Sequence, residues 1–113
     1  MTQKEKEILS SETITPEVID FVTQRIVHLF SPEKVIMFGS QARGESLADS
    51  DLDLFIVKDS EKGNLEMEGD INISFWGRRF PLDIVVRKPK EIEQSNSEFL
   101  HTIFKEGVIL YGK

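Results

Sequence analysis

The segment 50–57, Ser-Asp-Leu-Asp-Leu-Phe-Ile-Val, decides the fold prediction for this chain of 113 residues. It is a short apolar run that follows a polar stretch, and it predicts a buried strand over Leu52–Lys58. Successive side chains of a strand point to opposite faces. Asp51 and Asp53 therefore share one face, while the aliphatic residues that alternate with them fill the other.

Two aspartates on one face of an apolar strand carry an electrostatic cost. Aspartate is depleted in strands, and two carboxylates about 5 Å apart repel by ~3 kcal/mol at an effective dielectric constant of ~20. A divalent cation held by both side chains would offset that repulsion. The chain has no cysteine and only two histidines, His28 and His101. Carboxylate ligands favour Mg²⁺, Mn²⁺ or Ca²⁺, and a zinc site is not expected.

A third acid interrupts another apolar run, Pro-Leu-Asp-Ile-Val-Val at positions 81–86. We expect a strand over Leu82–Arg87, which Pro89 ends. If this strand pairs beside the one that carries Asp53, Asp83 joins the same cluster of acids. The alternative is that Asp83 is a solvated residue near a strand end, which is the ordinary role of a lone aspartate there.

The dipeptide Gly39-Ser40 directly follows another predicted buried strand, Lys34–Phe38, and opens a short helix that Gly44 closes. Free backbone N–H groups at such a turn favour an anion, and the Ser40 hydroxyl can donate a hydrogen bond to a phosphate oxygen. A plain turn with a capping serine is the competing interpretation. The pairing with the acids makes a site for a polyphosphate and a metal ion the sharper hypothesis.

The other elements complete an α/β pattern. Thr15 and Pro16 are the cap and first residue of a helix that ends at Ser31-Pro32. The stretch Ser60–Gly77 is ambiguous, because glycines and β-branched residues weaken its helical pattern. A last helix starts at the serines of 95–97, and a strand over Val108–Tyr111 closes the chain. This helix is expected to bury the following residues: Phe99, Leu100, Ile103 and Phe104.

The predicted fold class is α/β (α+β), with a mixed central sheet flanked by helices. The organisation is one domain over residues 14–113, preceded by a flexible N-terminal arm over 1–13 in which Ile8 and Leu9 could dock. The formal net charge is −6, from 20 acidic and 14 basic residues. An acidic surface disfavours stable binding of duplex nucleic acid. No apolar run approaches the ~20 residues that cross a bilayer, so we expect a cytoplasmic protein.

Two segments together resemble a known family. The first is Phe38-Gly39-Ser40-Gln41-Ala42-Arg43-Gly44-Glu45, and the second is Ser50-Asp51-Leu52-Asp53-Leu54. Together they are similar to the signature of the minimal nucleotidyltransferases of the polymerase-beta-type superfamily. The segments 81–85 and 106–111 resemble the later strand that carries the third acid and the closing strand of that family. The resemblance spans about Thr15 to Tyr111. The glycine-interrupted stretch Ser60–Gly77 departs from the family pattern.

The resemblance implies a nucleotidyltransferase that uses ATP and two Mg²⁺ ions. By position, Gly39 and Ser40 would hold the triphosphate, and Asp51 and Asp53 would bind the metal ions. Asp83 would complete the metal cluster and help to deprotonate the attacking hydroxyl.

One further residue of the signature has an open role. Arg43 matches a recurrent arginine of the family. It would either contact phosphate or pin the loop through Asp49 or Asp51.

The acceptor of the AMP group is a separate question. Stand-alone members of the resembled family pair with a helical HEPN-type protein in a toxin–antitoxin system, and they transfer AMP to a tyrosine of the toxin. The resemblance therefore implies an antitoxin with such a partner. The sequence leaves open whether it forms a homo- or a hetero-oligomer. The alternatives are a small-molecule nucleotidyltransferase of the antibiotic-resistance type and a non-catalytic antitoxin that neutralises by binding alone.

Overall fold

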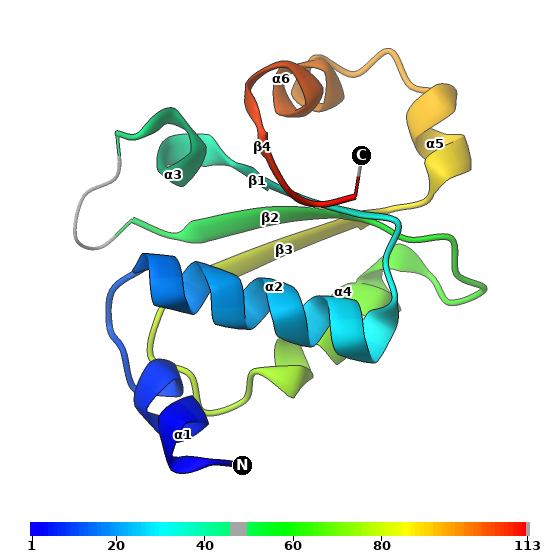
Figure 1. Ribbon diagram of the computed structural model, residues 1–113. Coiled ribbons are helices and arrows are strands. Elements are labelled where there is room, and N and C mark those ends of the chain that lie inside the picture. Colours follow the sequence, from blue (N-terminus) through cyan, green and yellow to red (C-terminus); the bar gives the residue numbers. More distant parts are fainter. Residues whose placement is uncertain (46–49, 113) are drawn as a thin grey trace.

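The computed structural model describes residues 1–45 and 50–112, and it has the predicted α/β architecture of a sheet flanked by helices (Figure 1). Residues 46–49, in the polar stretch that precedes Asp51, lie outside the described residues. Each predicted strand is present. The elements are α1 (Gln3–Leu9), α2 (Pro16–Phe30), β1 (Lys34–Phe38), α3 (Gly39–Arg43), β2 (Leu52–Val57), α4 (Asn64–Ser74), β3 (Leu82–Arg87), α5 (Pro89–Glu93), α6 (Glu98–Glu106) and β4 (Val108–Tyr111).

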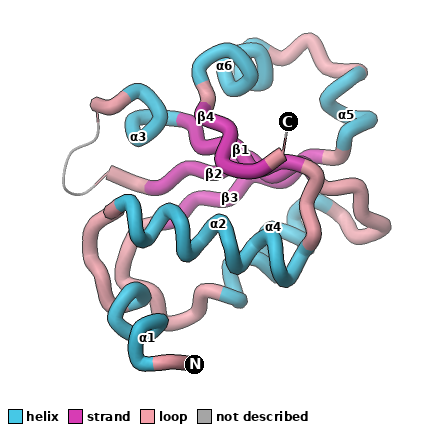
Figure 2. Tube along the Cα trace, in the orientation of Figure 1, coloured by secondary structure: helices cyan, strands magenta, loops and turns pink. Residues whose placement is uncertain are grey.

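The four strands form one mixed sheet in the order β3-β2-β1-β4 (Figure 2). Strand β1 runs antiparallel to both of its neighbours, while β2 and β3 are parallel. Parallel neighbours need a crossover connection, usually a helix, and α4 supplies it here. The ambiguous stretch over 60–77 is therefore helical at its centre, because the topology demands a crossover at that point.

Helices cover both faces of the sheet, so that β2 is buried along nearly its whole length. Helices α2 and α4 pack on one face, against Leu52, Leu54 and Ile56, which have no exposed surface. Helix α6 lies over the other face (Figure 1), where Phe55 packs with Ile103. The alternation predicted for β2 is confirmed. The face that carries the aspartates is also covered, beginning two residues after Asp53.

The N-terminal segment differs from the expected flexible arm, because Gln3–Leu9 form helix α1. Thr2 and Glu5 make a reciprocal capping box at its start, which satisfies two free backbone donors. The carboxylate of Glu5 also accepts a hydrogen bond from Arg25 of α2 at 2.6 Å. Ile8 and Leu9 are buried in the main core, as the sequence suggested they could be.

Two other expectations need correction. Pro89 was expected only to end β3, but it is also the first residue of helix α5, a position that suits proline. In α6, Ile103 is buried as predicted, but Phe99 and Phe104 are 45% and 44% exposed. Phe99 meets Phe38 edge to face and Phe104 meets Phe55 in the same way, and each ring keeps the rest of its surface exposed.

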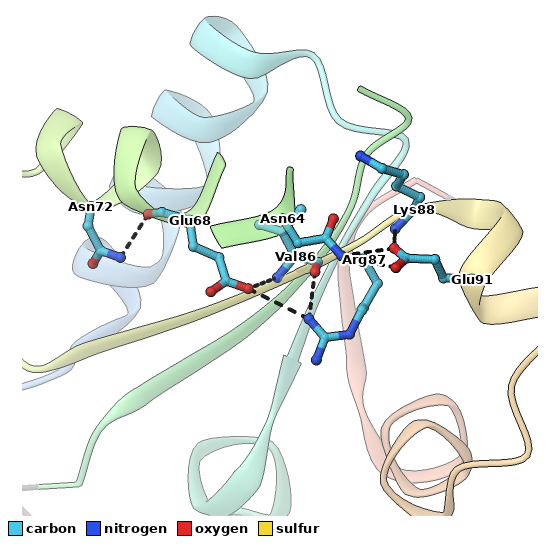
Figure 3. Close-up of polar contacts among 7 residues, drawn as sticks. All are labelled: Asn64, Glu68, Asn72, Val86, Arg87, Lys88 and Glu91. Carbon is cyan, nitrogen blue, oxygen red and sulfur yellow. Dashed lines mark hydrogen bonds and ion pairs between the residues drawn. The ribbon is translucent and has the colours of Figure 1, made fainter. Parts of the chain in front are cut away.

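Polar contacts anchor β3, the edge strand that carries Asp83 (Figure 3). Glu68 of α4 accepts a hydrogen bond from the Val86 backbone N–H at 2.9 Å and lies 3.7 Å from the Arg87 guanidinium. At the end of the strand, Glu91 accepts hydrogen bonds from the Lys88 N–H and the Asn64 amide. These contacts tie β3 to the helices on either side of it, and thereby set where Asp83 lies.

Candidate active site

The antiparallel and parallel pairings bring three predicted site segments to one end of the sheet. The last residue of β1, Phe38, pairs with Asp53 near the start of β2. Asp53 in turn pairs with Asp83 near the start of β3. The end of an antiparallel strand therefore meets the starts of two parallel ones. The conditional prediction that Asp83 would lie beside Asp53 is confirmed at the level of strand register.

Gly39 directly follows β1 and lies against the Asp53 side chain. Its φ angle is +74°, a conformation that favours glycine over residues with a Cβ atom. A Cβ atom at this position would stand 2.4 Å from the Asp53 Oδ2 atom. The glycine is therefore required twice, once by the turn and once by the carboxylate that occupies the space beside it.

Burial and two neighbouring acids shift the pKa of the Asp53 carboxyl. Desolvation by burial, followed by the negative charges of Asp83 and Asp51, raises the pKa of the Asp53 carboxyl from 3.8 to about 6. The positive charge of Arg43 opposes this rise. Asp51 and Asp83 are exposed, whereas Asp53 is half-buried between them. A cation at this end of the sheet would relieve the unfavourable interaction that the raised pKa reports.

The donor set fits a hard divalent cation, although the carboxylates are not drawn together around a single point. Over residues 1–45 and 50–112, no three acidic or histidine side chains are arranged so as to hold a metal ion as they stand. The ligands at this site would be the carboxylate oxygens of Asp51, Asp53 and Asp83. Mg²⁺ prefers oxygen ligands of this kind. Asp51 and Asp83 are exposed, so their side chains are free of the packing that would prevent them from turning inward.

The short helix α3 presents Gly39 and Ser40 at this same end. The residue at its N-cap position, Phe38, has no side chain that could accept a hydrogen bond from the first backbone N–H groups. Gln41 donates a hydrogen bond to the Ser50 carbonyl oxygen at 3.5 Å. This contact ties α3 to the residue that precedes Asp51, so the glycine-serine turn and the acidic segment are held side by side.

The structure brings Arg43 near the acids, where it pairs with Glu45 and not with Asp51. Its Nε atom lies 3.2 Å from a carboxylate oxygen of Glu45. No ion pair with Asp51 is formed, and Asp49 lies outside the described residues. The arginine acts on Asp53 only through its charge in this arrangement.

A pocket beside the turn was not foreseen from the sequence. A cavity of about 200 Å³ lies between α3 and α6, with Gly39, Phe38, Phe99, Thr102 and Glu106 among its lining residues. Sequence patterns place each of these residues on a strand or helix. No local signal indicates that α6 crosses beside α3, because that approach depends on the packing of α6 against the sheet.

Comparison with known proteins identifies the family. The sequence matches the nucleotidyltransferase domain family over residues 19–110, most of the chain. This chain belongs to the nucleotidyltransferase domain family. The matched residues include every nucleotidyltransferase site residue predicted from the sequence. No curated protein matches the sequence.

Solved structures share the nucleotidyltransferase fold at low sequence identity. A nucleotidyltransferase candidate from Sulfolobus solfataricus is 19% identical, with a TM-score of 0.60 over 97% of this chain and 86% of its own. A toxin–antitoxin structure with AMP-PNP is 15% identical, with a TM-score of 0.58 over 83% of this chain and 73% of the other. A mutant of the MntA-HpeT toxin–antitoxin is 12% identical, with a TM-score of 0.55 and the same coverage.

Proposed function

We propose that this nucleotidyltransferase domain transfers AMP from ATP to a hydroxyl group, and that Asp51, Asp53 and Asp83 are its catalytic and metal-binding residues. The observation that carries the proposal is the position of Asp53. It pairs with Asp83 across the sheet, and its carboxylate lies where a Cβ atom of Gly39 would be. A proposed metal-binding carboxylate and the proposed phosphate-binding turn are thus in direct contact.

Each residue has a defined part in the proposed reaction. Gly39 and Ser40 hold the triphosphate through backbone N–H groups and the serine hydroxyl. Asp83 accepts the proton of the attacking hydroxyl as its oxygen bonds to the α-phosphorus of ATP. The bond from that phosphorus to the bridging oxygen of the β-phosphate breaks, and pyrophosphate leaves.

Two Mg²⁺ ions held by Asp51, Asp53 and Asp83 would neutralise the phosphate charge and lower the pKa of the attacking hydroxyl. The rest of the catalysis comes from holding the reactants in line within a preorganised site. Arg43 contributes positive charge beside the acids, and it reaches phosphate once it leaves Glu45. That ion pair is exposed, and exposed pairs contribute little to stability, so the arginine can exchange partners at small cost.

For the acceptor, we propose a tyrosine hydroxyl on a helical HEPN-type toxin that this chain neutralises. Two of the similar structures are toxin–antitoxin structures, one of them with AMP-PNP, and this supports a partner of that kind. A phenol suits the site because its oxygen needs a nearby base to become a good nucleophile. An antibiotic-type small molecule remains the contrasting acceptor class.

The test is a labelling experiment with the purified chain, Mg²⁺ and a candidate helical HEPN-type toxin. We expect the label of ATP to reach the partner from the α-phosphate and not from the γ-phosphate. Asp51→Asn with Asp53→Asn should abolish the transfer, whereas Asp59→Asn, an exposed acid beyond the other end of β2, should not. Full toxin neutralisation by the double variant would refute the catalytic proposal in favour of an antitoxin that acts by binding alone.

A further inference from the structure

The pocket between α3 and α6 begins at a residue of the proposed triphosphate cradle. Gly39 lines it on one side, and residues of α6 line it on the other. Its volume is about 200 Å³, whereas sites for whole drug-sized ligands occupy about 300–1,000 Å³. The pocket is therefore large enough for one flat ring system, next to the place where the phosphates would lie.

Two phenylalanines supply an aromatic wall. Phe38 and Phe99 meet edge to face, with ring centroids 5.7 Å apart and an interplanar angle of 88°. Phe99 nevertheless leaves 45% of its surface exposed, so a ring face remains available for stacking. Bases stack on aromatic side chains, and each such contact contributes about 1–3 kcal/mol.

Two polar side chains at the rim lack partners. Within the described residues, neither the Thr102 hydroxyl nor the Glu106 carboxylate makes a hydrogen bond or an ion pair, while the nearby Arg43 pairs with Glu45. A carboxylate only accepts hydrogen bonds. It can accept a hydrogen bond from the exocyclic amine of adenine, whereas guanine bound in the same orientation would place its O6 oxygen there. It also repels phosphate groups.

We propose that the pocket between α3 and α6 binds the adenine base of the donor nucleotide, with the base stacked on Phe99 and its amine donating to Glu106. This inference rests on the proposed function, because the base can enter only if the triphosphate lies at Gly39 and Ser40. It makes Phe99 and Glu106 base-binding residues, of which Glu106 favours ATP over GTP. A tyrosine ring of the protein acceptor is the competing occupant.

The chain offers a matched control for each variant. Phe99→Ala is compared with Phe104→Ala, since both residues lie on α6 and are 45% and 44% exposed. Phe104 also meets a phenylalanine of the sheet edge to face, at 5.9 Å, but it does not line this pocket. Glu106→Gln is compared with Glu98→Gln, another exposed acid of the same helix.

Binding of ATP, GTP and inorganic tripolyphosphate is measured by calorimetry with Mg²⁺ on each folded variant. Phe99→Ala should weaken the binding of ATP at least about 5-fold and leave the binding of tripolyphosphate unchanged. Phe104→Ala should alter the affinity for neither compound. Glu106→Gln should lower the preference for ATP over GTP by about 5-fold or more, because an amide can also donate to guanine. Glu98→Gln should keep the preference of the wild type.

The outcomes separate the two proposals. If wild-type protein binds tripolyphosphate and ATP but Phe99→Ala binds ATP normally, the base site is wrong while the triphosphate cradle stands. If wild-type protein binds neither compound, the proposed function itself fails. If Phe99→Ala raises only the KM for the protein acceptor, the pocket holds the acceptor ring and the adenine assignment is overturned.

Discussion

Replacement of Gly39 by alanine should have two separate effects. It should lower the free energy of unfolding slightly, and it should lower the rate of AMP transfer strongly. The φ angle of +74° imposes a penalty of about 1–2 kcal/mol on a residue with a Cβ atom. The new methyl group would also stand 2.4 Å from the Asp53 Oδ2 atom. That oxygen is at the end of a side chain that can rotate, so the clash adds little to the loss of stability.

The same rotation should be expensive for function. It moves the Asp53 carboxylate, which is proposed to hold the metal ions together with Asp83. A displacement of about 1 Å in a catalytic group can cost 100-fold in rate. We therefore expect the variant to remain folded, with a free energy of unfolding lower by about 1–2 kcal/mol. AMP transfer should fall about 100-fold. Urea unfolding and transfer of α-labelled phosphate measure the two effects.

Gly77→Ala is the control for the backbone penalty. Gly77 also has a positive φ angle, +90°, but a Cβ atom there would meet nothing within 4 Å. This control should lose a similar amount of stability and keep its transfer activity. The reasoning would be refuted if Gly39→Ala transferred AMP at the wild-type rate, or if Gly77→Ala lost as much activity as Gly39→Ala.

Three further changes test other parts of the structure. Because the folded-state pKa of Asp53 is raised from 3.8 to about 6, the metal-free protein should lose stability as the pH rises through this window. Asp53→Asn should remove that loss and stabilise the protein by ~1 kcal/mol at pH 8, after a discount for solvent screening; identical urea midpoints from pH 4 to 8 in EDTA for both proteins would contradict this. Glu68→Ala removes the acceptor of the Val86 N–H and should lower the free energy of unfolding by about 1–2 kcal/mol, as measured by urea denaturation; an unchanged midpoint would show that water replaces the carboxylate. Gly107→Ala would place a methyl group 2.4 Å from Ile36 Cγ2 and from a backbone oxygen, so we expect a loss of about 1–3 kcal/mol by thermal denaturation, and a Tm equal to that of the wild type would exclude the clash.

Local signals in the sequence were enough to locate most elements. Thr15 and Ser97 accept hydrogen bonds from the backbone at the starts of α2 and α6, and Gly44 ends α3 at a φ angle of +71°. Capping and turn chemistry depend on residues within about four positions of one another. Sequence reasoning is therefore strong at these positions.

The alternation in β2 was also readable in advance. Period-2 spacing places Asp51 and Asp53 on one face whatever the strand pairs with, and the buried aliphatic residues of β2 confirm the other face. The sequence alone therefore determined which residues of β2 face the core and that Asp53 faces the other way. Asp51 lies one residue before β2 begins, so its shared face with Asp53 stays a prediction. The sequence also pointed to the chemistry of the acids, since cysteine is absent and carboxylates are the available ligands.

Tertiary structure decided which of these features meet. The parallel register of β2 and β3 places Asp83 next to Asp53, and the sequence could state this only as a condition. The exposure of Phe99 likewise follows from where α6 crosses the sheet, and the pocket beside Gly39 exists only because of that crossing. Contacts between residues far apart in the chain depend on how whole elements pack, and local patterns carry no information about that packing.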